Sequence, residues 1–210
     1  MPHYKLTYFD LRGRGEVIRM MFAIARVHYE DVRIQKDEWE RIKDSTPFEA
    51  LPMLEVDGVK IAQTQAILRY IAREFGHAGP DNLSSAIADS LADQYVDFLT
   101  STYAWLSVVA GHIEGVEDAL YKSVYLPARK KNFPYFETAL KKSTSGWYAG
   151  TPSLTHADVL IAASLEFLIR LDKNGDKIFE GFPLMELQYK KFFALPTIVK
   201  HVAERPDARY

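Results

Sequence analysis

Residues 4–34 read YKLTYFDLRGRGEVIRMMFAIARVHYEDVRI, and this stretch decides the fold of the first part of the chain. Tyr4 to Phe9 predicts a short strand, which Gly13 and Gly15 interrupt. Apolar residues then recur at helical spacing from Glu16 to Val27, and Tyr29 to Ile34 is rich in β-forming residues. Two strands joined by a helix within about 35 residues predict a right-handed parallel unit.

The same unit continues to residue 76. Lys36 to Asp44 predicts a short, irregular helix. Asp57-Gly58 between two short apolar runs predicts a tight hairpin. Thr64 is expected to cap a helix that runs to Phe75, and Gly76 then stands where a left-handed residue ends a helix.

The rest of the chain predicts helices and no strands. After a turn-rich linker at 77–82, helical patterns cover about 84–110, 118–142 and 155–171, with shorter pieces at 184–193 and 197–204. Pro127 and Pro134 are expected to bend or break the second of these. Thr155 and Asp158 have the spacing of a capping box. The fold class is therefore α/β plus all-α, with a domain at 1–76 and a helical domain at 83–210.

Composition excludes several classes of function. The 210 residues carry a formal net charge of −2, so no basic excess favours nucleic acid. No apolar segment approaches the length of a membrane span, and the first residues lack a signal-peptide core. These absences make the cytoplasm the expected location. The chain has no cysteine, which excludes disulfides, thiolate metal sites and a cysteine nucleophile.

Three positions suggest a role in binding or catalysis, and each also has an ordinary structural interpretation. Tyr8 ends the first strand and faces the start of the first helix, or it is simply a strand aromatic with its hydroxyl at the surface. If the Leu51-Pro52 bond is cis, the backbone groups of Leu51 turn outward and can pair with an extended peptide; otherwise Pro52 is an ordinary strand entry. Gln63 and Thr64 open a helix whose N-terminus suits a carboxylate.

These motifs occur together with Arg14, Trp39, Lys43 and the capping box, in a shared order and spacing. Over its whole length the chain resembles the cytosolic glutathione transferases, and most closely the sigma class, which includes nematode and prostaglandin D synthase-like members. The resemblance implies a thioredoxin-like first domain, a helical-bundle second domain and glutathione as co-substrate. It also explains how a chain without cysteine can use a thiol.

The resemblance implies a role for each matching residue. Tyr8 would donate to the glutathione sulfur and Arg14 would support it electrostatically, which makes these two the catalytic residues. The glutathione-binding residues would be Tyr8, Arg14, Trp39, Lys43, Leu51, Pro52, Gln63, Thr64 and Asp97. Relatives carry Gln or Lys where this chain has Ala50, so we expect glutathione to bind more weakly by about 1 kcal/mol.

The implied reaction is the attack of the glutathione thiolate on an electrophilic, apolar acceptor. We expect the acceptor pocket between the domains, with a wall formed by Phe9, Arg12, Gly13, Tyr103, Trp105 and Leu106. Two alternatives remain open: a glutathione-dependent isomerase of the prostaglandin D synthase kind, and a non-catalytic carrier of haem or other hydrophobic ligands.

The family resemblance also implies a homodimer. Asp89, Asp93 and Asp97 fall on one helical stripe, which is either a solvated acidic face or the lining of a two-fold interface. In the second case Asp97 would meet the α-amino group of glutathione bound to the other subunit. A divalent cation between facing stripes is conceivable, but Val96 stands where prostaglandin synthase relatives carry another carboxylate, so we expect no metal site.

Overall fold

The computed structural model describes residues 2–208, which divide into two compact units. Among the described residues, the first unit comprises 2–78 and 193–208, and the second comprises 79–192. The sequence division differs from this one, because it assigned residues 193–210 to the helical domain. Within the described residues, no helix combines the length and the apolar character needed to cross a membrane.

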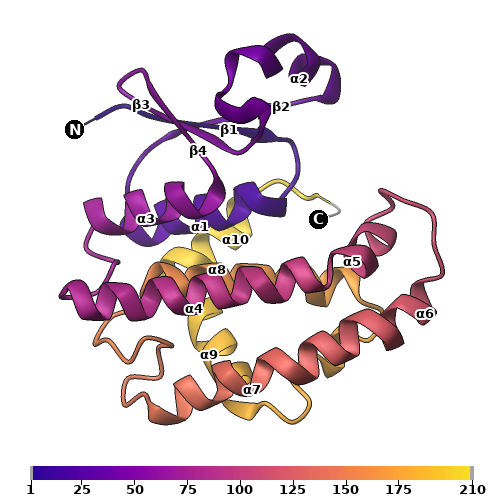
Figure 1. Ribbon diagram of the computed structural model, residues 1–210. Helices are drawn as coiled ribbons and strands as arrows, with labels where there is room; N and C mark the ends of the chain where they lie inside the picture. The colour runs from indigo at the N-terminus through magenta and orange to yellow at the C-terminus, as the bar shows by residue number, and fades with distance from the viewer. Residues whose placement is uncertain (1, 209–210) are drawn as a thin grey trace. The chain divides into compact units, whose positions relative to one another are not determined.

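The first unit is built on a four-stranded sheet in the order β2-β1-β3-β4 (Figure 1). Its strands are β1 (Tyr4–Phe9), β2 (Glu30–Ile34), β3 (Met53–Val56) and β4 (Val59–Ala62). β2 runs parallel to β1, whereas β3 is antiparallel to both β1 and β4. The parallel unit predicted from residues 4–34 is therefore confirmed. So is the Asp57-Gly58 hairpin, in which both residues have the positive φ that this turn requires.

The helices of the first unit are α1 (Gly13–Ala25), α2 (Lys36–Ile42), α3 (Thr64–Glu74) and α10 (Pro196–Glu204). Short 3-10 turns at Lys43–Ser45 and Pro47–Glu49 follow α2. Figure 1 shows α1 and α3 side by side on one face of the sheet and α2 on the other. Fully buried side chains of β1, α1 and α3 fill the space beneath the sheet, among them Leu6, Ile18, Phe22, Ile67 and Ile71. Burial of these apolar surfaces is what stabilises the layers.

The second unit is helical. It contains α4 (Asn82–Ser101), α5 (Tyr103–Val109), α6 (Glu117–Leu120), α7 (Leu126–Lys142), α8 (His156–Leu171) and α9 (Pro183–Phe193). A π-helical turn occupies Tyr121–Tyr125, and a 3-10 turn lies at Gly175–Lys177. As expected from its apolar sequence, α8 is the buried helix of the unit: eleven of its residues are buried, and α4 packs against it.

Two helical predictions need correction. The helix expected over 84–110 is two helices that meet at Thr102, whose hydroxyl bonds back to the carbonyl of Leu99 at 2.8 Å. Pro127 does not break a helix: it stands in the first turn of α7, where its missing N–H costs nothing. Pro134 lies inside α7 without ending it.

The capping box at the start of α8 is confirmed. Thr155 is the N-cap residue, and its backbone N–H donates to Asp158 Oδ2 at 2.8 Å. Asp158 also accepts from the Tyr148 amide at 2.9 Å and from Gln188 Nε2 at 3.3 Å. Burial raises the pKa of Asp158 to about 6, against the opposing effect of these hydrogen bonds. The box therefore fixes the chain before α8 as well as the helix itself.

Candidate functional site

The centre of the site is Tyr8, the last but one residue of β1. Its side chain is 8% exposed, and its Oη accepts a hydrogen bond from the backbone N–H of Arg14 at 3.1 Å. The first turn of α1 thus points an amide at the phenol. The side chain of Arg14 is exposed, so the amide and not the guanidinium makes the hydrogen bond.

Two glycines hold the phenol against α1. A Cβ atom on Gly15 would lie 2.4 Å from Tyr8 Cδ1, and one on Gly13 would lie 2.9 Å from Tyr8 Oη. Gly13 also has a φ of +40°, which favours glycine. Sequence analysis read the two glycines only as the end of a strand. Their closeness to the ring depends on a contact that residue spacing does not encode.

The environment of Tyr8 keeps its proton in place at neutral pH. Burial raises the pKa of the phenol, and the Arg14 amide together with the charges of Arg14 and Arg19 only partly opposes this effect. Because Oη already accepts from the amide, its own hydrogen remains available as a donor. The group is suited to stabilise a negative atom placed beside it.

Strand register brings Pro52 and Gln63 to the same end of the sheet as Tyr8. Met53 is opposite Thr7 on one side and opposite Ala62 on the other. The next residues along these strands are Tyr8, Pro52 and Gln63, so all three stand at one edge of the sheet. The Leu51-Pro52 bond is cis, the condition on which its predicted role depended.

The start of α3 differs from the prediction. Thr64 does not cap the helix: it is the first helical residue, and Gln63 occupies the N-cap position. No side chain in the described part of the chain caps α3, because the backbone of Gln63, with φ 73° and ψ 117°, departs from the extended conformation that places a cap. A positive φ at a residue other than glycine is uncommon and occurs often at functional sites. Sequence analysis selected Gln63 for its amide and missed this backbone feature.

Trp39, on α2, is linked to the site through Phe9, and Lys43 directly follows α2. The Phe9 ring packs edge-on against both Tyr8 and Trp39, with centroid distances of 5.8 and 5.9 Å. Lys43 Nζ lies 3.6 Å from Glu49 Oε2 at the surface. Such an exposed pair contributes about 1 kcal/mol or less, so Lys43 can exchange Glu49 for another carboxylate.

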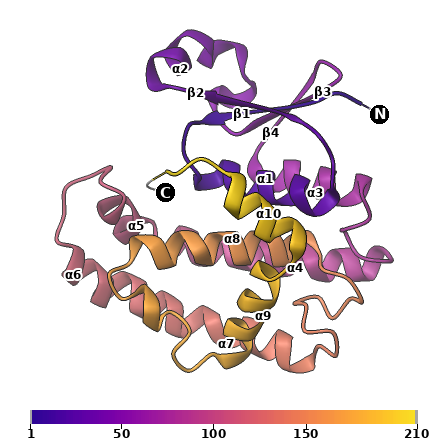
Figure 2. The ribbon, with the colours of Figure 1, turned by 180° about the vertical axis from the view of Figure 1, so that it is seen from behind.

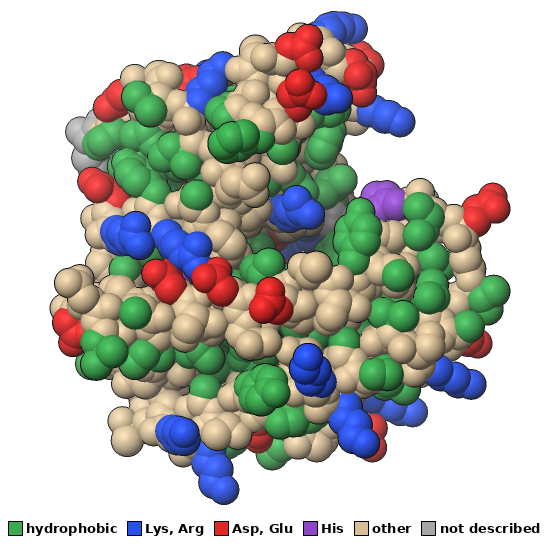
Figure 3. Space-filling model, in the orientation of Figure 1, with side chains coloured by type: hydrophobic (Ala, Val, Ile, Leu, Met, Phe, Trp, Pro, Cys, Tyr) green, Lys and Arg blue, Asp and Glu red, His purple; other side chains and the backbone are tan. Residues whose placement is uncertain are grey.

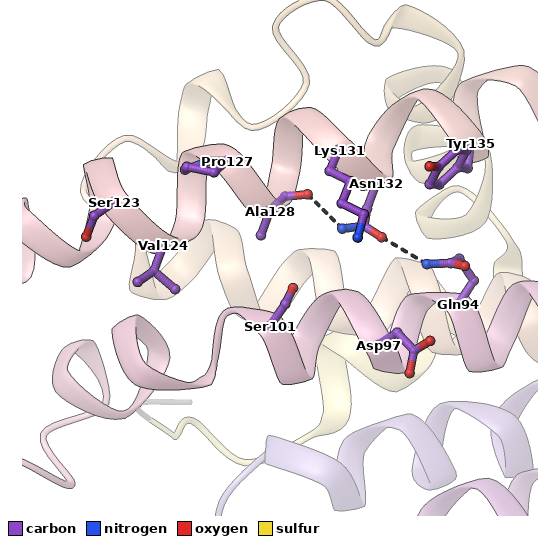
Figure 4. Close-up of a pocket in the computed structure, with 10 residues that line it drawn as sticks. All are labelled: Gln94, Asp97, Ser101, Ser123, Val124, Pro127, Ala128, Lys131, Asn132 and Tyr135. Carbon is purple, nitrogen blue, oxygen red and sulfur yellow. Dashed lines mark hydrogen bonds between the residues drawn. The ribbon is translucent and has the colours of Figure 1, made fainter.

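Asp97 lies on α4, in the helical unit. It lines a groove of about 690 Å³ between α4 and α7, together with Gln94, Ser101, Lys131, Asn132 and Tyr135 (Figure 4). Two hydrogen bonds join residues that line the groove. Gln94 Nε2 donates to Asn132 Oδ1 at 2.9 Å, and Asn132 Nδ2 donates to the Ala128 carbonyl at 2.8 Å. The lining of the groove mixes polar and apolar side chains, and the groove belongs to one unit of the chain.

The acidic stripe on α4 is present (Figure 3), but its members differ. Asp93 and Asp97 are exposed, whereas Asp89 Oδ1 lies 3.1 Å from Nε2 of the buried His156. The stripe is therefore neither wholly solvated nor uniform. Across residues 2–208, no group of three or more His, Asp or Glu side chains has the proximity that a metal ion needs.

The residues predicted to contact the acceptor have varied surroundings. Phe9 and Gly13 adjoin Tyr8, while Arg12 is buried with its Nη2 3.5 Å from Asp207 Oδ1. In the helical unit Tyr103 is exposed and Leu106 half-buried. Trp105 is fully buried and packs against Tyr125 with a centroid distance of 4.3 Å.

Comparison with known proteins identifies one family, the glutathione S-transferases, over both units. Residues 4–73 match the glutathione S-transferase N-terminal domain, and residues 103–205 match the C-terminal domain. Glutathione S-transferase 1 of Ascaris suum is 42% identical over the full length of both chains. The crystal structure of the glutathione S-transferase of Ascaris lumbricoides is 41% identical, again with full coverage of both chains and a TM-score of 0.94.

Other solved structures differ in their stated class and assembly. A Nu-class enzyme from Haemonchus contortus is 40% identical over both whole chains, with a TM-score of 0.90. A prostaglandin synthase D of Nilaparvata lugens is 30% identical over 99% of this chain and all of the other, with a TM-score of 0.85. A transferase of Necator americanus described as monomeric is 42% identical with the same coverage and a TM-score of 0.93. These matches, together with the thioredoxin-like sheet and the helical unit, establish that the chain belongs to the glutathione S-transferase family and is a transferase.

Proposed function

We propose that this transferase binds glutathione at the sheet edge around Tyr8 and joins its sulfur to electrophilic, apolar acceptors. The observation that carries the proposal is the buried Tyr8 phenol, which the Arg14 amide holds at the start of α1 and whose pKa is raised by burial. It supplies a hydrogen-bond donor and a positive helix end in one place, and both favour an anion.

The chemistry follows from the thiol. A free thiol has a pKa of about 8.5, so only a few per cent is thiolate at pH 7. A hydrogen bond from Tyr8 to the sulfur lowers that pKa, and the thiol proton passes to water. The thiolate then attacks the electrophilic carbon, a carbon–sulfur bond forms, and the leaving group departs with its bonding electrons. Tyr8 keeps its proton throughout.

Glutathione would lie along the sheet edge. We assign its cysteine unit to the backbone of Leu51, beside the cis Pro52, and its γ-glutamyl carboxylate to Gln63 and the uncapped start of α3. The glycine carboxylate would replace Glu49 beside Lys43, with Trp39 next to it.

Ala50, which has no side-chain donor, would leave one contact unmade. The variant Ala50→Gln is therefore expected to tighten glutathione binding about fivefold, which corresponds to about 1 kcal/mol. An unchanged dissociation constant would refute this assignment.

The assembly, class and location are proposed on the family resemblance. We propose a homodimer in which Asp97 meets the α-amino group of glutathione in the other subunit, and membership of the sigma class. The six acceptor-contacting residues and a cytoplasmic location stay predictions. Subcellular fractionation tests the location.

A second candidate activity is a glutathione-dependent prostaglandin isomerase, favoured by the similarity to a prostaglandin synthase D. The same thiolate would attack one peroxide oxygen of an endoperoxide, which forms an S–O bond and breaks the O–O bond. Loss of the proton from the carbon that carries this oxygen would then form the ketone, break the S–O bond and release the thiolate, so glutathione would not be consumed. Analysis of the prostaglandin products separates isomerisation from conjugation.

The experiment that tests the proposal is turnover of a chloro-nitro-aromatic acceptor with glutathione. We expect conjugate and chloride in equal amounts from the wild-type protein, and a loss of about ten- to a hundredfold in kcat/KM for Tyr8→Phe. Turnover that does not depend on the Tyr8 hydroxyl would contradict the proposed mechanism.

A further inference from the structure

A buried carboxylate, Glu16, stands in the first turn of α1, two residues after the amide that holds Tyr8. It is 4% exposed, and its Oε1 lies 2.8 Å from His201 Nε2 and 2.8 Å from Arg205 Nη1. His201 belongs to α10, and Arg205 directly follows it. Figure 2 shows α10 beside α1, in agreement with their contact. Glu16, near the start of the sequence, is therefore bound by two residues that lie more than 180 positions later.

Glu16 is connected to Tyr8 through Arg19. Arg19 Nη1 lies 3.6 Å from Glu16 Oε2, and the Arg19 guanidinium carbon lies 5.9 Å from the centroid of the Tyr8 ring. Arg19 also donates to both carboxylate oxygens of Asp31, at 3.0 and 3.1 Å, and to the Leu11 carbonyl at 2.8 Å. One fully buried guanidinium thus stands between the phenol and two carboxylates.

The charge of Glu16 has the wrong sign for a thiolate site. A buried carboxylate at the start of α1 reduces the positive potential that the helix end and Arg19 provide. His201 and Arg205 bind the Glu16 oxygen that does not face Arg19, and they oppose this loss of positive potential. Further charged or titratable groups lie close by in the described residues: Arg14 beside Tyr8, Tyr29 near Glu16, Asp31 with Arg33 beside Arg19, and Arg12 paired with Asp207.

We propose that the C-terminal segment, through His201 and above all Arg205, neutralises Glu16 and thereby sets the ionisation of the thiol bound at Tyr8. His201 and Arg205 are positioning residues, because they act through Glu16 and Arg19 and do not contact the sulfur. This inference rests on the proposed role of Tyr8.

The test is the pH profile of kcat/KM together with the ultraviolet absorbance of glutathione thiolate bound to the protein. In Arg205→Gln the charge of Glu16 is less compensated, so the pKa of the bound thiol should rise by about one unit. The corresponding loss in kcat/KM is about tenfold at pH values below the wild-type pKa, and it should disappear at high pH.

The double variant Glu16→Gln with Arg205→Gln should return the profile toward that of the wild type, because the uncompensated charge is gone. Lys200→Gln is the matched control. It removes a positive charge from the same helix, at an exposed residue 3.9 Å from Glu204, and should leave the profile unchanged. His201→Gln keeps a donor near Glu16 and should give a smaller shift in the same direction, which provides a second variant if Arg205→Gln fails to fold.

An unshifted profile in Arg205→Gln, or an equal loss of activity at every pH, would overturn the inference, because the second result marks a purely structural contact. Tyr8→Phe is measured in parallel. If Tyr8→Phe shifts the profile and Arg205→Gln does not, this inference fails while the proposed function stands. If Tyr8→Phe leaves the thiol pKa unchanged, the proposed function fails.

Discussion

At the scale of single residues, the site depends on close contacts around one phenol. The Tyr8 ring lies so near the backbone of Gly15 that no side chain fits there, and its oxygen faces an amide of the helix. These contacts explain why a tyrosine at a strand end, which is unremarkable in sequence, becomes a donor of fixed direction. One prediction at this scale concerns the contact of Tyr8 with Gly15, and a second concerns the nearby Glu16.

Gly15→Ala should lose stability and activity together. Alanine favours a helix over glycine by about 1 kcal/mol, so without a clash the variant would be more stable. The new Cβ would instead lie 2.4 Å from Tyr8 Cδ1 and displace the ring. We expect a net loss of about 1–3 kcal/mol in the free energy of unfolding and at least a tenfold loss in kcat/KM. Urea denaturation and steady-state kinetics check this, and a stabilised, active variant would refute the close contact.

Glu16 should give the protein a specific sensitivity to acid. Burial alone would raise the pKa of Glu16, but hydrogen bonds from His201 and Arg205 outweigh it and hold the pKa at about 2. Because the folded pKa is below the unfolded one, its stabilising contribution is full above about pH 4.5 and is lost as the pH falls toward 2. The expected loss is about 3 kcal/mol. In Glu16→Gln this part of the pH dependence should be absent from urea denaturation curves; an unchanged pH slope would contradict the assignment.

At the scale of secondary-structure elements, most of the first unit could be predicted from sequence. Runs of β-forming residues, the helical spacing of Glu16 to Val27 and the Asp57-Gly58 turn are local signals, and strands, a helix and a hairpin form there, although the helix begins at Gly13 and ends at Ala25. The left-handed Gln63 could not be predicted, since no local preference favours a positive φ at glutamine. The pairing of Glu16 with Arg205 was missed for another reason: a contact between residues so far apart in the sequence leaves no periodic signal.

The capping box of α8 is an element whose removal should be costly. Asp158→Ala would leave the amides of Thr155 and Tyr148 without their acceptor inside the protein. We expect a loss of about 2–4 kcal/mol in the free energy of unfolding. Thr155→Ser keeps the hydroxyl and should cost less than about 1 kcal/mol. Equal losses in the two variants, measured by chemical denaturation, would argue against this role for Asp158.

At the scale of the whole molecule, the two units differ in how much sequence analysis could say of function. Of the residues proposed to bind glutathione in the first unit, Tyr8, Pro52 and Gln63 stand at the same end of the sheet, as strand register requires. In the helical unit, Trp105 is fully buried and packs against Tyr125, and its predicted contact with an acceptor stays a prediction. Helical spacing predicts the buried face of a helix but does not identify the ligand that an exposed face would bind.

The proposed homodimer can be measured directly. Sedimentation velocity should give a particle of about twice the chain mass at micromolar concentration, since closed two-fold dimers are the commonest assemblies of this size. The groove between α4 and α7 contains Lys131 and Asp97, so Lys131→Glu should weaken a dimer that uses this surface. A wild-type protein that sediments as a monomer, as the Necator americanus relative is described, would contradict the proposal.

The most direct test of the central claim is the pKa of the thiol of glutathione when it is bound, followed by thiolate absorbance in the wild-type protein and in Tyr8→Phe. We expect a thiol pKa at least one unit below that of free glutathione in the wild type, and a return toward the free value once the phenolic hydroxyl is removed. Equal thiol pKa values in the two proteins, with glutathione bound in both, would contradict it.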